Sequence, residues 1–342
     1  MHWPGFLCAF LLVGTCSLHA IPESDYAASY ERNVTPFLAS GERFTVRSAD
    51  GKTNLQGIRF LHPDAKGVIV VVNGNTESWL KYGELFYDLY QHGFSVTSYD
   101  HRGQGLSPHL GSVNPQIVQI DDFGLYAADL NAFVQQEIVP KKSAPAYLLA
   151  HSMGGGIALD YLEHYPSPFR AVVLSAPMIR INTAPYPEGV AWVTAAFFHA
   201  LGLGKHYVVG KHDRNPKEPF DGNKLTSSRM RWNAIQSVWN NHPEAVTGGP
   251  SNDWVAGAIA RTSVIRENLS KIKTRILILQ AGKDQFVMNP DQEVSQATIP
   301  GARLIKFPDS KHEILMERDP IRGRAIDASV DFFLARSNEQ IP

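Results

Sequence analysis

A serine lies at the junction between a predicted strand and a predicted helix. The apolar run Ala146-Tyr147-Leu148-Leu149 precedes the junction, and Gly155-Gly156-Ile157-Ala158-Leu159 follows it. Between them stands Ala150-His151-Ser152-Met153-Gly154, a G-x-S-x-G pattern with alanine in the first glycine position. A sharp strand-to-helix turn holds a serine hydroxyl exposed beside a base, and the helix N-terminus directs free N–H groups at developing negative charge. We therefore predict that Ser152 is a nucleophile, with a purely structural turn as the alternative.

An acid and a histidine follow later in the chain, each just after a predicted strand. Residues 275–280 and 303–307 are apolar enough to be strands, and they lead to Asp284 and His312 respectively. Because ligand sites of open α/β sheets form at the carboxyl ends of the strands, we expect both side chains near Ser152. His312 would take the serine proton and return it to the leaving alcohol, and Asp284 would fix the imidazole tautomer.

Two nearby residues offer alternatives to this assignment. Asp309 is a competing acid, but it lies in the same short loop as His312, where we expect it to form a turn. His151 adjoins the nucleophile, and its side chain is expected to point away, into the packing beneath the turn.

An early buried strand leads to a second group of backbone donors. Residues 68–72 are all β-branched, and Asn73-Gly74-Asn75 follows them. A tetrahedral intermediate needs two N–H donors, one from the residue after the nucleophile and one from such a loop. We predict that Met153 and Asn75 supply them, with an ordinary glycine turn as the alternative for Asn75.

Further motifs carry a family resemblance that runs from about Tyr26 to about Ala335. They are Glu77-Ser78, Lys81-Tyr82, Tyr99-Asp100-His101-Arg102-Gly103-Gln104-Gly105-Leu106-Ser107, Ala150-His151-Ser152-Met153-Gly154-Gly155, Ser175-Ala176-Pro177-Met178, Lys311-His312-Glu313-Ile314-Leu315 and Val330-Asp331-Phe332-Phe333. In combination they resemble bacterial lysophospholipases, which belong with the monoacylglycerol lipases of the α/β-hydrolase superfamily.

The resemblance implies the same site as the residues do. It places the catalytic triad on Ser152, Asp284 and His312 and the oxyanion donors on Asn75 and Met153. Asn73-Gly74 departs from the His-Gly of monoacylglycerol lipases, which favours the lysophospholipase branch.

Alternating strands and helices predict an α/β protein with a mostly parallel, doubly wound sheet, here the α/β-hydrolase fold with an inserted lid. At 342 residues and 44% hydrophobic content, the chain is long enough for one such domain. The expected division is a signal peptide at 1–20, a core at 21–176 and 270–342, and a lid at 177–269.

The lid contains two groups of candidate substrate contacts. Trp192, Phe197 and Phe198 lie in an uncharged apolar helix expected over residues 189–201, which would form an acyl-chain wall or face a membrane. Burial of this helix against the core is the alternative. Arg229 and Arg231 are candidates for a phosphate head group, or else for salt bridges within the lid.

The N-terminus has the pattern of a targeting segment. Residues 5–14 are apolar but too short for a comfortable membrane span, and cleavage after Ala20 is expected. The alternatives are an uncleaved membrane anchor and lipidation at Cys16. The two cysteines, Cys8 and Cys16, both lie in this segment, so an exported mature chain would contain none.

These observations predict a serine ester hydrolase acting on single-chain lipids through an acyl-enzyme, with lysophospholipids as the first substrate class. The alternatives are a monoacylglycerol lipase, a small-ester carboxylesterase, a peptidase of the same fold and, in a different class, an exported binding protein without chemistry. We expect no cofactor and no metal, and the net charge of -1 argues against nucleic acid. The sequence does not define an oligomeric state.

Overall fold

A computed structural model describes residues 21–109, 113–141, 144–215 and 217–335. The predicted signal peptide lies outside these residues and stays a prediction. Within the described part of the chain, none of the helices is both long and apolar enough to cross a membrane.

Eight strands in the described residues form one sheet in the order β1-β2-β4-β3-β5-β6-β7-β8. β2 runs antiparallel to both of its neighbours, and all the other pairs are parallel. The central strands are almost fully buried, as expected for parallel strands covered on both faces. This confirms the predicted α/β class and mostly parallel sheet. The strands are β1 (Glu42–Arg47), β2 (Asn54–Phe60), β3 (Val68–Val72), β4 (Ser95–Tyr99), β5 (Ala146–His151), β6 (Phe169–Ser175), β7 (Arg275–Ala281) and β8 (Arg303–Phe307).

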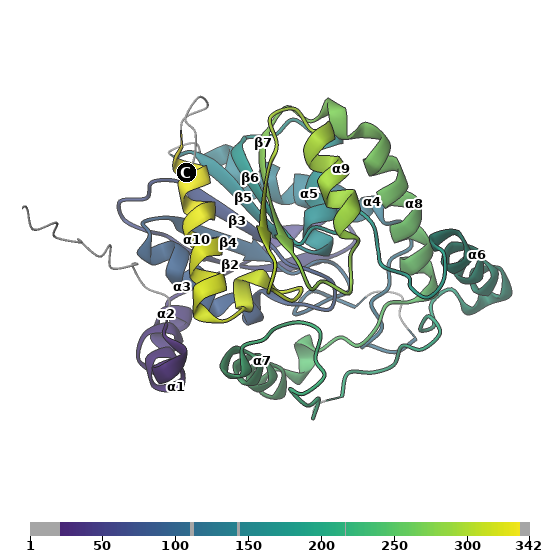
Figure 1. The fold of residues 1–342 in the computed structure, drawn as a ribbon, viewed down its shortest axis with the longest axis horizontal. Coiled ribbons are helices and arrows are strands. Elements are labelled where there is room, and N and C mark those ends of the chain that lie inside the picture. Colours follow the sequence, from purple (N-terminus) through teal and green to yellow (C-terminus); the bar gives the residue numbers. More distant parts are fainter. Residues whose placement is uncertain (1–20, 110–112, 142–143, 216, 336–342) are drawn as a thin grey trace, which may run out of the picture.

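Helices cover both faces of the sheet (Figure 1). One hydrophobic cluster joins α3 and α10 to one face, and another joins α4, α5, α8 and Ile299, the residue after α9, to the opposite face. The helices are α1 (Tyr26–Ser29), α2 (Thr35–Ala39), α3 (Gly83–Gln91), α4 (Gly124–Phe133), α5 (Met153–His164), α6 (Glu188–Phe198), α7 (Arg229–Asn241), α8 (Asn252–Asn268), α9 (Asn289–Thr298) and α10 (Asp319–Leu334).

The segment between β6 and β7 contains α6, α7 and α8, of which only α8 belongs to a helical layer. Helices α6 and α7 lie outside the two helical layers (Figure 1). Helix α8 lies within one of them, because its Trp254, Ala258 and Ile265 belong to the same hydrophobic cluster as Ile157 of α5. The last helix of the range predicted as lid, residues 177–269, is therefore packed into the core.

Candidate active site

Ser152 occupies a strained turn between β5 and α5. Its φ of 52° and ψ of -117° lie outside the regions that non-glycine residues normally adopt. Two backbone hydrogen bonds hold this conformation: Ser152 N–H donates to Ser175 O at 3.0 Å, and Met178 N–H donates to Ser152 O at 2.8 Å. Strain of this kind costs on the order of 1–3 kcal/mol and persists only where the surroundings impose it.

The close approach of α5 to β3 depends on Gly154. A Cβ atom on this residue would lie 2.4 Å from the carbonyl oxygen of Val72 and 2.6 Å from that of Asn73. These are fixed backbone atoms, so a side chain at Gly154 would push the start of α5 away from the strand. The glycine therefore sets the position of the turn that carries Ser152.

Ser152, His312 and Asp284 are joined by hydrogen bonds although they are far apart in sequence. His312 Nε2 lies 2.8 Å from Ser152 Oγ, and His312 Nδ1 lies 2.6 Å from Asp284 Oδ2. His312 is buried in the loop after β8, where the rings of His151 and Phe286 each pack 4.9 Å from its own ring. The structure thus brings together the three side chains that the sequence analysis selected.

The environment of Asp284 favours its ionised form. Burial alone would raise the pKa of this carboxyl, but its hydrogen bond to His312 opposes that effect. The backbone N–H groups of Phe286 and Val287 also donate to Oδ1, at 2.7 and 3.2 Å. The net result is a pKa below the usual value, so the carboxylate remains charged and orients the imidazole.

The competing acid, Asp309, has a different partner. Its carboxylate pairs with Lys283 Nζ at 2.9 Å, and both side chains are more than half exposed. A solvated pair of this kind does not orient a buried imidazole, so the geometry favours Asp284 over Asp309.

The two predicted oxyanion donors lie at the ends of neighbouring strands, β3 and β5. On either side of Asn75, the N–H groups of Gly74 and Thr76 are taken up by side chains, those of Glu77 and Gln104. Among the described residues, the N–H of Asn75 and that of Met153, the first residue of α5, are assigned no acceptor. Both are free to donate, and their role stays a prediction.

A buried carboxylate holds the loop that contains Asn75. Asp100, just after β4, accepts from Asn73 Nδ2 at 3.0 Å and from the N–H of Trp79 at 2.7 Å. It also accepts from Ser78 Oγ at 2.7 Å and from Leu106 N–H at 2.8 Å. The sequence analysis gave Asp100 no such role, although an acid buried directly after a central strand is a signal for one.

His151 points beneath the turn, as predicted. Its Nδ1 lies 3.2 Å from Ser175 O, and its Nε2 lies 3.8 Å from Glu77 Oε1. Burial lowers the pKa of this imidazole to about 3, so the ring stays neutral at physiological pH.

Helix α6 carries the three apolar residues predicted to contact substrate. Trp192 and Phe197 are exposed, whereas Phe198 is half-buried and packs edge-on against Phe197. The helix packs on α8 through its other side. An acyl-chain contact of these residues stays a prediction.

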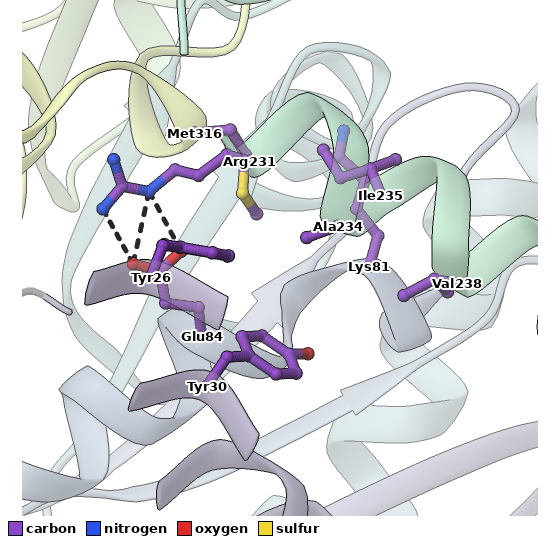
Figure 2. A pocket seen from close by; sticks show the side chains of 9 residues that line it. All are labelled: Tyr26, Tyr30, Lys81, Glu84, Arg231, Ala234, Ile235, Val238 and Met316. Atoms are coloured by element: carbon purple, nitrogen blue, oxygen red, sulfur yellow. Dashed lines mark hydrogen bonds and ion pairs between the residues drawn. The ribbon is translucent and has the colours of Figure 1, made fainter. Parts of the chain in front are cut away.

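The structure contradicts the phosphate-binding role predicted for Arg231. Its guanidinium is buried beneath α7 and binds the Glu84 carboxylate at 2.9 and 3.0 Å (Figure 2). It also donates to Asp319 Oδ1 and to the carbonyls of Ile21 and Glu317. All three of its nitrogens have acceptors, and the adjoining cavity of about 10 Å³ has room for at most one water molecule. The prediction that Arg231 binds a phosphate group is therefore wrong.

Two other arginines of this segment differ in their partners. Arg229 is exposed, pairs with Asp221 at 2.8 Å and lies over Phe220. Arg214 was not selected from the sequence. Its guanidinium carbon lies 5.4 Å from the centre of the Trp239 ring, and its buried Nε has no hydrogen-bond partner among the described residues.

Burial lowers the pKa of Arg214, and the charges of Glu218, Glu313 and Glu77 oppose this effect. Glu218 is only a loose partner, at 3.8 Å. Because the charge of Glu313 contributes to the pKa of Arg214, the guanidinium is electrostatically coupled to the residue next to His312.

Two groups of described side chains have metal-ligand types and spacing, but each already contacts a cation. In the group Glu77, His151 and Glu313, the ammonium of Lys81 binds both carboxylates. In the group Asp160, Glu163 and His164, Arg261 binds Asp160 through two hydrogen bonds.

Comparison with known proteins identifies the family of the chain. Residues 63–319 match the family described as "Serine aminopeptidase, S33". The chain is 34% identical to lysophospholipase L2 of Escherichia coli K12 over 297 residues, which cover 81% of this chain and 83% of that protein. It is 33% identical to the probable lysophospholipase L2 of Haemophilus influenzae over 300 residues, which cover 86% of this chain and 93% of that protein.

A solved structure supports the fold alone. A soluble variant of monoglyceride lipase from Saccharomyces cerevisiae, in complex with a substrate analogue, superposes with a TM-score of 0.67 at 17% identity. The match covers 86% of this chain and 94% of that one.

The sheet order and the strand–serine–helix turn define an α/β-hydrolase. Within that superfamily, the chain belongs to the serine aminopeptidase S33 family. The lysophospholipase and monoacylglycerol lipase relatives confirm the predicted enzyme class, a carboxylic ester hydrolase.

Asp284→Asn should lower kcat for ester hydrolysis by on the order of 10³–10⁴-fold, because asparagine donates to His312 and stabilises the wrong tautomer. The measurement is steady-state hydrolysis of a p-nitrophenyl ester. Asp309→Asn is the matched control and should change kcat by less than about twofold, because surface ion pairs contribute little. A large loss in the control with little loss in Asp284→Asn would contradict the assignment of the acid.

Proposed function

We propose that this protein is a serine hydrolase of lipid esters whose main substrates are lysophospholipids. The observation that carries the proposal is the hydrogen-bonded chain from Ser152 through His312 to Asp284 at the strained turn. The relatives at 33% and 34% identity are a probable lysophospholipase L2 and a lysophospholipase L2, which supports the lipid substrate class.

In the acylation step, Ser152 Oγ attacks the ester carbonyl carbon while His312 Nε2 takes the serine proton. Negative charge develops on the carbonyl oxygen, where the N–H groups of Asn75 and Met153 stabilise it. Each such donor is worth about 10²–10³-fold in kcat. When the C–O bond to the head-group alcohol breaks, His312 returns the proton to the leaving oxygen.

In the deacylation step, His312 Nε2 takes a proton from a water molecule that attacks the acyl-enzyme. The second tetrahedral intermediate uses the same two donors. Its collapse returns the proton to Ser152 and releases the fatty acid. Throughout, the Asp284 carboxylate stabilises the imidazolium that forms twice in each cycle.

The first test is a paired substrate panel of lysophosphatidylcholine and monoacylglycerol with the same acyl chain. We expect the wild-type protein to prefer the lysophospholipid in kcat/KM, and Ser152→Ala to lose both activities while keeping the wild-type melting temperature. A preference for the glyceride would identify a monoacylglycerol lipase instead. Retained turnover in a folded Ser152→Ala protein would exclude this nucleophile, and no turnover by the wild type would favour a peptidase or a binding protein.

We further propose that Arg214 contributes to recognition of the phosphate head group. Its Nε is buried without a hydrogen-bond partner among the described residues, and the charge of Glu313, next to His312, opposes the lowering of its pKa by burial. A guanidinium is suited to phosphate because it offers a planar set of donors. By contrast, Arg229 is well solvated and already paired.

Arg214→Met should lower kcat/KM for lysophosphatidylcholine by about tenfold, the value of one charged hydrogen bond. Hydrolysis of the glyceride should change by less than about twofold. Arg229→Met is the matched control and should leave both substrates unaffected. Equal losses on both substrates for Arg214→Met, or a selective loss in Arg229→Met, would contradict this assignment.

A third proposal concerns contact with lipid surfaces through helix α6 and the turn after it. Val190, Val193, Phe197 and Leu201 recur at helical spacing, and each exposes about half of its surface or more. An exposed apolar stripe of this kind is typical of segments that lie on a membrane surface.

Val193→Ser combined with Phe197→Ser should weaken binding to phospholipid vesicles by at least about tenfold, since the two side chains lose apolar contact area. Sedimentation with vesicles measures this effect, and hydrolysis of a soluble short-chain ester should stay unchanged. Leu61→Ser, an equally exposed apolar residue elsewhere on the surface, is the control. Unchanged vesicle binding by the double variant would exclude the stripe as the contact.

A further inference from the structure

Two loops of the active site come from opposite halves of the chain and are joined by one buried lysine. The oxyanion loop, residues 73–77, contains Asn75, and the histidine loop, residues 310–313, contains His312. Lys81 lies between them on a short helix, Trp79–Tyr82, and its side chain is 3% exposed. The proposed catalytic mechanism assigns no role to Lys81.

At the oxyanion loop, the partner of Lys81 is Glu77. The Lys81 ammonium donates to Glu77 Oε1, and the other oxygen, Oε2, accepts from the N–H of Gly74 at 2.6 Å. Tyr82 Oη donates to the same Oε2 at 2.5 Å. Since Gly74 directly precedes Asn75, the Glu77 carboxylate fixes the peptide next to the proposed oxyanion donor.

At the histidine loop, the partner of Lys81 is Glu313. Lys81 Nζ lies 2.7 Å from Glu313 Oε1, and this carboxylate is also buried. Glu313 directly follows His312 in sequence. The N–H of Glu313 donates to Leu225 O at 2.9 Å, so the same residue also ties the histidine loop to the lid segment.

A third contact runs through His151. Its Nε2 lies 3.8 Å from Glu77 Oε1, and its ring packs 4.9 Å from the ring of His312. The cluster of Glu77, Lys81 and Glu313 is therefore connected to the catalytic imidazole through the peptide of Glu313. The neutral ring of His151 lies near both Glu77 and that imidazole, but its Nε2 has no hydrogen-bond partner among the described residues.

Stability alone is a poor explanation for this cluster. Burying ion pairs costs several kcal/mol per ion in desolvation, and apolar replacements of similar size are often neutral or stabilising. Burial opposes the ionised forms of Glu77 and Lys81, but nearby charges outweigh it. The charge of Lys81 shifts the pKa of Glu77 downward, and the charges of Glu313 and Glu77 shift the pKa of Lys81 upward. Glu77 and Lys81 therefore remain charged, and the main consequence of their pairing is a fixed position of the loops that they join.

We propose that Glu77, Lys81 and Glu313 form an ionic clamp that positions the oxyanion loop relative to the histidine loop during ester hydrolysis. The three are positioning residues, because they act through Asn75 and His312 rather than on the substrate. The inference rests on the proposed serine hydrolase mechanism. Loss of the clamp is expected to affect transition-state stabilisation, because the oxyanion donors bind more strongly to the tetrahedral intermediate than to the substrate.

The test replaces all three charges at once, Glu77→Gln with Lys81→Met and Glu313→Gln, so that no member of the cluster is left charged without its partners. Hydrolysis of a soluble p-nitrophenyl ester should show a 10- to 100-fold lower kcat with KM within about twofold of the wild type, the pattern of a lost transition-state interaction. Labelling of Ser152 by a fluorophosphonate, which forms a tetrahedral adduct, should slow by a similar factor. The melting temperature should remain close to that of the wild type.

The matched control removes another ion pair, Asp160→Asn with Arg261→Met, in which Arg261 of α8 binds Asp160 of α5 at 2.6 and 2.7 Å. It should leave kcat unchanged. A wild-type kcat in the folded triple variant, or an equal loss in the control, would overturn the clamp while leaving the hydrolase proposal intact. If the wild type hydrolyses no ester, both proposals fail.

If the triple variant does not fold, the single variant Glu313→Gln tests the clamp instead, since it leaves Lys81 paired with Glu77. It should lower kcat by about three- to tenfold at constant KM, as expected for exchanging a charged hydrogen bond for a neutral one. An unchanged kcat in this variant would overturn the clamp.

Discussion

The strained backbone at Ser152 is the constraint on which the rest of the site depends. A serine with positive φ holds its hydroxyl above the end of β5, and the bare backbone of Gly154 allows α5 to start directly against the carbonyls of β3. The strain is balanced by hydrogen bonds to Ser175 and Met178 in the next strand and its loop. Rigid strands on both sides of β5 thus define where the nucleophile lies.

The same edge of the sheet brings the other groups to Ser152. β3 leads to Asn75, β7 leads to Asp284 and β8 leads to His312, and the parallel register places the ends of these strands side by side. Buried polar and charged side chains connect the loops at this edge. Asp100 fixes the start of the oxyanion loop, and the Glu77–Lys81–Glu313 cluster links its end to the histidine loop. The geometry therefore depends on buried polar contacts between loops as much as on the strands.

Much of this arrangement could be predicted from the sequence, because its signals are local. Runs of apolar residues predicted the strands, and small residues around Ser152 predicted the turn. Asp284 and His312 could be selected because each follows a strand within a few residues. The resemblance to lysophospholipases then supported the same three positions.

The errors and omissions concern contacts between residues far apart in sequence. Arg231 was selected as a lid residue, but its partners Glu84 and Asp319 lie 147 and 88 residues away. Only the folded chain brings them together, with the N-terminal segment packed against α7 (Figure 2). Lys81 was named only as part of a family motif, and its contact with Glu313, 232 residues away, was not predicted for the same reason. Helix α8 was included in the predicted lid because the alternation of strands and helices stops over residues 177–269, and its packing on α5 is visible only in the folded chain.

The central claim is that Ser152 attacks an ester carbonyl whose oxygen is held by the N–H groups of Asn75 and Met153. The most direct test is a crystal structure of the protein after reaction with a long-chain alkyl phosphonate, which mimics the tetrahedral intermediate. We expect phosphorus bonded to Ser152 Oγ and one phosphonyl oxygen about 2.7–3.1 Å from both backbone nitrogens. An adduct on another residue, or an oxygen directed away from Asn75 and Met153, would contradict the account.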